Sequence, residues 1–124
     1  MPEPPPVGVG IDLESYSALG RLDDASVQRA ALRWLSGPEL AWCGSQTSLA
    51  SSLVTVLSCK EAAFKAWPGV RAAHDVRLES LEGKPWAGSA WALREGVVVE
   101  VSWRRWRDQV LAVAVAHRRA GRPC

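Results

Sequence analysis

The residues VGVGIDLE, at positions 7–14, alternate strictly between two kinds of side chain. Branched apolar residues take one set of positions, and two glycines, Asp12 and Glu14 take the other. Because successive side chains of a strand point to opposite faces, this period of two predicts a half-buried strand from Val7 to Glu14. Gly8 and Gly10 leave room on the polar face for another backbone or a ligand to approach.

After this strand and a polar loop at 15–24, the apolar residues recur at helical spacing. We expect helices at about 25–35, at 38–44 after a proline-containing restart, and at 48–67. The long helix has Thr47 or Ser48 as its N-cap and ends at a Pro-Gly pair.

Beyond the long helix the period returns to two. The predicted strands are 75–81, 86–93, 97–103 and 109–117, with turns at 82–85 and 94–96. The order predicts an α+β fold: one strand, two to three helices, then three to four antiparallel strands, with the helices packed on one sheet. We expect one domain over 7–124, preceded by a proline-rich arm at 1–6.

The composition is that of a globular protein, with 48% hydrophobic and 23% charged residues. No apolar run approaches the roughly 20 residues that span a bilayer, and the N-terminal residues do not resemble a secretory signal. Three cysteines without a C-x-x-C pair argue against a disulfide framework or a zinc site. We therefore expect a cytoplasmic protein with reduced thiols.

The net charge of +2 is too small to indicate a nucleic-acid partner. Residues 104–122, however, hold six arginines against one acid, Asp108. This basic segment fits either a solvated surface or a docking face for an acidic partner or a phosphate-bearing ligand.

Asp12 and Glu14 stand two positions apart on the predicted strand, so their carboxylates point the same way from Cα atoms roughly 6.5–7 Å apart. Two such carboxylates can converge on one hard cation, and they repel each other when nothing lies between them. The same spacing also fits a polar strand end that faces water.

Glu61 lies near the apolar stripe of the long predicted helix, about 40° from Leu57 on the helical wheel. A carboxylate in that position must be paired, hydrogen-bonded or metal-bound. Lys65 follows one turn later in the favourable Glu-to-Lys order, so an ordinary surface salt bridge also fits.

Together, Asp12, Glu14 and Glu61 offer three oxygen ligands for Mg²⁺, with waters and phosphates in the remaining positions. Lys65 beside them is a point charge for a phosphate oxygen. This set of residues suits phosphoryl or phosphodiester chemistry, in which positioning and charge neutralisation supply most of the catalysis.

Two segments resemble the signature motifs of the 4′-phosphopantetheinyl transferases. VGIDLE at 9–14 is similar to (V/I)-G-(I/V)-D-x-E, and LSCKEAAFK at 57–65 is similar to (F/W)-(S/A/C)-x-K-E-(A/S)-x-x-K. The second motif is long and fairly specific, whereas the first alone is weak. The segment QVLAVAVA at 109–116 is also similar to the final strand of the surfactin-type branch.

The resemblance implies an enzyme that moves the phosphopantetheine arm of coenzyme A to a serine of an acyl or peptidyl carrier protein, releasing 3′,5′-ADP. Fatty acid and polyketide biosynthesis use this modification. Asp12, Glu14 and Glu61 would hold Mg²⁺ against the pyrophosphate, and Glu61, or a water it orients, would accept the serine proton. Lys65 would neutralise charge on the phosphate in transfer, and Lys60 would bind phosphate or support Glu61.

The chain departs from the surfactin-type members, which are about twice as long and consist of two similar halves. It matches the second half only and has the length of the holo-acyl-carrier-protein synthases. The first half normally supplies a Lys-Pro turn and a Ser-His pair that bind the phosphates of coenzyme A. Here Lys84 stands in a Gly-Lys-Pro turn, Ser102 has no histidine after it, and Arg105 is the candidate phosphate contact instead.

A chain with one half of the motifs implies a homodimer or homotrimer with coenzyme A at the subunit interface. Basic residues would steer an acidic carrier to the site, either Arg21, Arg29 and Arg33 or the cluster at 104–107. The alternative is a catalytically inactive module that binds a carrier protein or coenzyme A. A third hypothesis, a surface-binding protein, rests on the seven tryptophans and explains neither motif.

Overall fold

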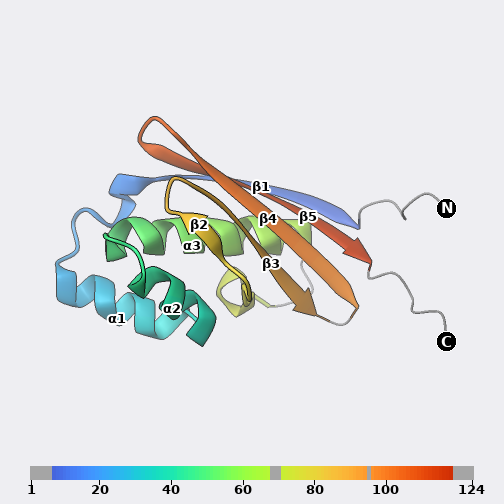
Figure 1. Ribbon diagram of the computed structural model, residues 1–124, viewed down its shortest axis with the longest axis horizontal. Coiled ribbons are helices and arrows are strands. Elements are labelled where there is room, and N and C mark those ends of the chain that lie inside the picture. Colours follow the sequence, from blue (N-terminus) through green and yellow to red (C-terminus); the bar gives the residue numbers. More distant parts are fainter. Residues whose placement is uncertain (1–6, 68–70, 95, 119–124) are drawn as a thin grey trace.

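The computed structural model describes residues 7–67, 71–94 and 96–118. Five antiparallel strands form one sheet in the order β1-β5-β4-β3-β2. The strands are β1 (Gly8–Ser15), β2 (Glu82–Lys84), β3 (Ala87–Arg94), β4 (Val97–Trp106) and β5 (Gln109–Arg118). Strands β2 to β5 follow one another along the chain, and β1 pairs with β5 at the far edge (Figure 1).

Three helices cover one face of this sheet: α1 (Asp24–Trp34), α2 (Gly37–Gly44) and α3 (Leu49–Ala66). Helix α3 contacts β1, β4 and β5, and α1 and α2 pack against α3 (Figure 1). The N-cap of α3 is Ser48, whose hydroxyl accepts a hydrogen bond from the Ser51 N–H. The predicted α+β arrangement, with helices packed on one sheet, is confirmed.

One predicted strand is wrong. Residues 73–75 form a 3₁₀ turn, and no strand covers 76–81 in the described part of the chain. Val76 and Leu78 are buried as the alternation indicated, but the Leu78 N–H bonds the carboxylate of Glu39 instead of a neighbouring strand. The edge of the sheet beyond β3 is taken by β2, which replaces part of the turn predicted at 82–85.

The glycines of β1 bring its backbone into direct contact with α3. A Cβ added at Gly10 would lie 2.0 Å from the Ala62 carbonyl oxygen, and one at Gly8 would lie 1.9 Å from that of Ala66. The glycines were expected to leave room for another backbone or for a ligand, and in the structure the backbone of α3 approaches them. Asp12, on the same face of β1, is therefore carried against α3.

The apolar face of β1 is exposed in the single chain. Its branched residues retain between 42% and 57% of their accessible surface. The strand is half-buried as predicted, and the buried side is the one that carries Gly10 and Asp12. Cross-strand pairing extends the exposed face over β5, and it ends at β4, which presents Glu100, Ser102 and Arg104 on the same side of the sheet. We call this the outer apolar face: Val7, Val9, Ile11, Leu13, Leu111, Val113 and Val115.

Some of the predicted features lie outside the described residues. These are the arm at 1–6, the Pro-Gly pair after the long helix, Glu95 of the 94–96 turn, Arg119, Arg122 and Cys124. No helix in the described ranges has the length and apolar character needed to cross a membrane.

Candidate active site

Asp12 lies at the contact between β1 and α3 and is only 7% exposed. Its Oδ1 accepts a hydrogen bond from Lys65 Nζ at 3.1 Å, and its Oδ2 accepts one from Ser58 Oγ at 2.8 Å. Lys65 Nζ also donates to the carbonyl oxygen of Ile11. Both donors project from α3, so the two predicted motifs meet at this carboxylate.

The pairing of Lys65 differs from the salt bridge that its spacing suggested. Its ammonium forms an ion pair with Asp12, and among the described ion pairs none joins it to Glu61. Lys65 is 47% exposed, so its charge also faces solvent. The lysine therefore bridges the strand and the helix.

Glu14 and Glu61 belong to the same electrostatic neighbourhood as Asp12. The pKa of Glu14 is raised above its ordinary value, first by partial burial and then by the negative charges of Asp12 and Glu61, while Lys65 lowers it. Asp12 and Glu61 thus act on Glu14, and Lys65 is the cation beside them.

Within 7–67, 71–94 and 96–118, no three His, Cys, Asp or Glu side chains converge closely enough to form a ready metal cluster. The fit of Asp12, Glu14 and Glu61 to Mg²⁺ is therefore one of donor type and charge. Three carboxylates with one lysine leave an excess negative charge, and their oxygens are the hard ligands that Mg²⁺ prefers. The residues suit the ion, and the ion itself remains a proposal.

Lys60 does not fit the predicted phosphate contact. Its ammonium is 1% exposed and donates to Glu39 Oε1 at 2.8 Å and to the Trp34 carbonyl oxygen at 2.9 Å. These bonds hold the ammonium inside the protein, away from a phosphate at the surface. Because a buried charge needs a close partner, Glu39 fixes Lys60 in place. Lys60 joins α1, α2 and α3 immediately before Glu61, which agrees with the supporting role that was its other expectation.

Glu39 is a residue that the sequence reasoning missed. Its carboxylate is fully buried, and it also accepts hydrogen bonds from the N–H groups of Ser36 and Leu78. The Ser-x-x-Glu spacing at 36–39 was a signal for the local part of this network, because it is typical of a capping box. No local spacing in the sequence indicates its long-range partners, Lys60 and Leu78.

Side-chain donors from distant segments hold the backbone of the predicted Gly-Lys-Pro turn, residues 83–85. The donors are Trp42 to the Gly83 carbonyl, Trp103 to that of Lys84, and Tyr16 and Thr55 to that of Pro85. The Lys84 side chain is exposed. Its cross-strand neighbours on the same side of the sheet are, in order from β3 to β1, Ala87, Arg104, Leu111 and Leu13. Lys84 therefore belongs to the outer face, and the single chain does not bring it to Asp12.

Arg105 belongs to the face that carries the acids. Its register partner is Val110, which pairs in turn with Glu14. The guanidinium of Arg105 lies 5.3 Å from the centre of the Tyr16 ring, and its Nε donates to the Arg107 carbonyl oxygen. Arg105 is exposed at the same end of the sheet as Glu14, so its predicted phosphate contact stays a prediction.

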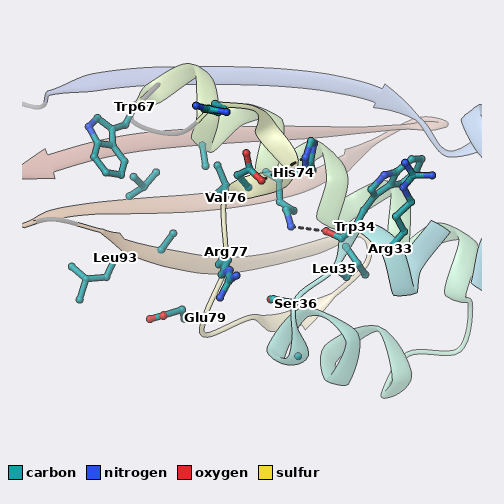
Figure 2. A pocket seen from close by; sticks show the side chains of 17 residues that line it. Arg33, Trp34, Leu35, Ser36, Trp67, His74, Val76, Arg77, Glu79 and Leu93 are labelled. Carbon is teal, nitrogen blue, oxygen red and sulfur yellow. Dashed lines mark hydrogen bonds and ion pairs between the residues drawn. The ribbon is translucent and has the colours of Figure 1, made fainter. Parts of the chain in front are cut away.

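A pocket of about 980 Å³ opens beside α3, and its lining does not include Asp12, Glu14, Glu61 or Lys65. Figure 2 shows it between the ends of α1 and α3 and the segment that follows α3. Its lining includes three arginines and two tryptophans: Arg33, Arg71, Arg77, Trp34 and Trp67. A dashed line in Figure 2 marks the bond from Lys60 to the Trp34 carbonyl at the pocket wall. The pocket is thus a basic and aromatic surface separate from the Asp12 junction.

Comparisons with known proteins show the family and the fold of the chain. Residues 8–116 match the 4′-phosphopantetheinyl transferase superfamily. The structure is similar to the holo-[acyl-carrier-protein] synthase of Neisseria meningitidis, with a TM-score of 0.69 and 25% identity, over 92% of this chain and 100% of the other. Among curated proteins, none matches the sequence significantly.

Two further solved structures share the fold. The acyl carrier protein synthase of Mycobacterium tuberculosis has a TM-score of 0.60 and 22% identity, over 92% of this chain and 99% of that one. The Helicobacter pylori holo-[acyl-carrier-protein] synthase, solved in complex with coenzyme A, has a TM-score of 0.64 and 21% identity, over 87% and 98%.

The chain belongs to the 4′-phosphopantetheinyl transferase superfamily. Its length and fold are those of the holo-[acyl-carrier-protein] synthase type of phosphopantetheinyl transferase. The resemblance that the two motifs indicated is confirmed.

Proposed function

We propose that this protein transfers the 4′-phosphopantetheine group of coenzyme A to a serine of an acyl or peptidyl carrier protein, with release of 3′,5′-ADP. The observation that carries the proposal is the junction at Asp12, where the strand motif and the helix motif meet through Lys65 and Ser58. The superfamily match and the likeness to holo-[acyl-carrier-protein] synthases support the same reaction.

In this reaction the serine oxygen bonds to the phosphorus that carries pantetheine, and the bond from that phosphorus to the oxygen of 3′,5′-ADP breaks. Glu61, half-buried on α3, or a water it orients, accepts the serine proton. Lys65 offers its exposed ammonium to an oxygen of the transferred phosphate while Asp12 anchors it. Lys65 and Asp12 therefore act by charge and by positioning.

Asp12, Glu14 and Glu61 are the residues that would hold Mg²⁺. When bound, the ion would neutralise negative charge on the pyrophosphate. The pKa of Glu14 is raised first by partial burial and then by the negative charges of Asp12 and Glu61, and this second contribution is one that a divalent cation would relieve.

The active form is a homodimer or homotrimer with coenzyme A at the interface between copies. The outer apolar face supports this, because a contiguous exposed apolar surface marks a site of association. Lys84 lies on that same face, so in an oligomer it reaches a site formed with the neighbouring copy. Sedimentation should show an oligomer that Ile11→Asp dissociates. A wild-type monomer that is active alone would contradict this assembly.

The carrier partner is acidic and docks on exposed arginines. Arg21, Arg29 and Arg33 lie on or just before α1, and Arg33 also lines the basic pocket. Opposite charge raises the association rate, and salt screens it. The buried free thiols of Cys43 and Cys59 suit a reducing compartment, in keeping with the cytoplasmic location expected from the sequence.

The experiment incubates the purified chain with coenzyme A, Mg²⁺ and a panel of apo-carrier proteins, and then measures the mass of each carrier. We expect one carrier to gain the mass of one phosphopantetheine group. Asp12→Ala and Glu61→Ala should abolish transfer while circular dichroism shows an intact fold. Near-wild-type turnover in either variant would refute the role of that residue.

The alternative, an inactive module that binds a carrier or coenzyme A, rests on the absence of a Ser-His pair at Ser102. Calorimetric titration with coenzyme A, with and without Mg²⁺, separates the two functions. Binding of coenzyme A without any mass gain in the whole carrier panel would favour the inactive module over the transferase.

A further inference from the structure

Ser58 is a fully buried serine in the middle of α3. Its hydroxyl donates to Asp12 Oδ2 at 2.8 Å, across the contact between helix and strand. The resemblance of residues 57–65 to the family motif implies no catalytic or binding role for Ser58. Its partner is the carboxylate on which the proposed cation site depends.

Two other buried hydroxyls of α3 show what such groups otherwise do. Ser52 Oγ donates to the Ser48 carbonyl oxygen at 2.7 Å, four residues back in the chain, which is the usual bond of a helical serine. Thr55 Oγ1 donates to the Pro85 carbonyl oxygen at 3.0 Å. Of these three hydroxyls, Ser58 is the one that bonds a carboxylate. A bond to a carboxylate is also stronger than a bond between neutral groups.

The hydrogen bonds of Asp12 constrain both of its oxygens. Lys65 holds Oδ1 and Ser58 holds Oδ2, so the plane of the carboxylate is fixed from two points on α3. A carboxylate has about four lone-pair positions, so each oxygen keeps capacity for another partner. Asp12 is thereby ordered without being saturated.

We propose that Ser58 is a positioning residue for the divalent cation site: its hydroxyl holds the Asp12 carboxylate in the orientation used for the ion. This inference rests on the proposed function, because it presupposes that Asp12 is a ligand. Without the hydroxyl, Lys65 is the remaining side-chain donor to Asp12, and that lysine is half-exposed and shared with the Ile11 carbonyl. The Asp12 carboxylate is then less ordered in the free protein, and the ion must fix its orientation on binding.

Partners that orient a metal ligand typically contribute about 10–100-fold to metal affinity or activity. We therefore expect Ser58→Ala to bind Mg²⁺ at least about 10-fold more weakly. The matched control is Ser52→Ala, which removes an equally buried hydroxyl from the same helix but leaves Asp12 untouched. Calorimetric titration of the full chain with Mg²⁺ measures both affinities without requiring turnover.

Transfer assays at increasing Mg²⁺ give a second measurement. Excess Mg²⁺ should restore the turnover of Ser58→Ala, while its KM for coenzyme A stays at the wild-type value. A general loss of helix stability would instead appear equally in Ser52→Ala. Thermal unfolding without metal should show the two variants within a few degrees of each other.

The outcomes separate this inference from the proposed function. Weaker Mg²⁺ binding in Ser58→Ala alone supports it. Equal Mg²⁺ affinity in wild type and Ser58→Ala, or equal weakening in Ser58→Ala and Ser52→Ala, overturns it while transfer by the wild type stands. A wild-type chain that neither binds Mg²⁺ nor modifies any carrier overturns both.

Discussion

Replacing Gly10 by alanine should separate β1 from α3 and disable the site at Asp12, two residues further along the strand. The added Cβ would lie 2.0 Å from the Ala62 carbonyl oxygen, whereas ordinary contact begins at 3.4 Å. The strand must therefore retreat by about 1.4 Å, the difference between these two distances. Carried along β1 to Asp12, that shift lengthens the 2.8 Å bond from Ser58 to about 4.2 Å, beyond hydrogen-bonding range.

The overpacked contact should destabilise the chain by about 1–3 kcal/mol. Urea unfolding measures this loss, and the transfer assay, run at a temperature where the variant is folded, should show a further loss of activity. Gly37→Ala is the matched control, because a Cβ at Gly37 meets no heavy atom within 4 Å. If Gly10→Ala were as stable and as active as Gly37→Ala, β1 could not lie directly on α3.

Three further perturbations test other parts of the structure. Glu39→Ala leaves the Lys60 ammonium buried without its carboxylate and should cost about 3–5 kcal/mol in urea unfolding; a wild-type midpoint would contradict the buried pair. Glu14→Gln should raise the melting temperature at neutral pH without Mg²⁺ and weaken Mg²⁺ binding. The raised pKa means that the folded chain holds this proton more tightly than the unfolded chain, so charged Glu14 lowers stability as pH rises through the two pKa values. An unchanged melting temperature would argue against crowding of the acids. Burial raises the pKa of Cys43 to about 12 and that of Cys59 still further, so peptide mapping should find neither alkylated by iodoacetamide until urea unfolds the chain.

The local parts of the fold could be predicted because their signals are local. The two-residue period around Asp12 and the Ser48 cap each depend on neighbours in the chain, and the structure has β1 and α3 within about two residues of the predicted ends. The second motif is also local, and it led to the family. What these signals could not provide was the partner of each element.

The misses share this cause. The spacing of Glu61 and Lys65 on one helix fits a salt bridge, which was the alternative to a phosphate contact for Lys65, yet Lys65 pairs with Asp12, 53 positions away. Lys60 was expected to bind phosphate or to support Glu61, and a glutamate 21 positions away holds its ammonium in the core. The alternation at 75–81 marked the burial of Val76 and Leu78 correctly, while the backbone N–H of Leu78 found its partner in the carboxylate of Glu39. In each case a contact distant in sequence overrode a local pattern.

The exposure of the apolar side of β1 follows the same principle. Alternation identifies the two faces of a strand but does not say which one meets the rest of the chain. Here the glycines decide it, because only a face without Cβ atoms allows α3 to approach so closely. The branched residues are then left exposed for the oligomer proposed above.

We propose that Asp12, Glu14 and Glu61 hold one divalent cation where β1 meets α3. A crystal of the full chain grown with Mn²⁺, which the same oxygen ligands accept, tests it directly through anomalous scattering. We expect one strong peak bounded by these three carboxylates. A structure with Mn²⁺ elsewhere, or with the three carboxylates turned away from any ion, would contradict it.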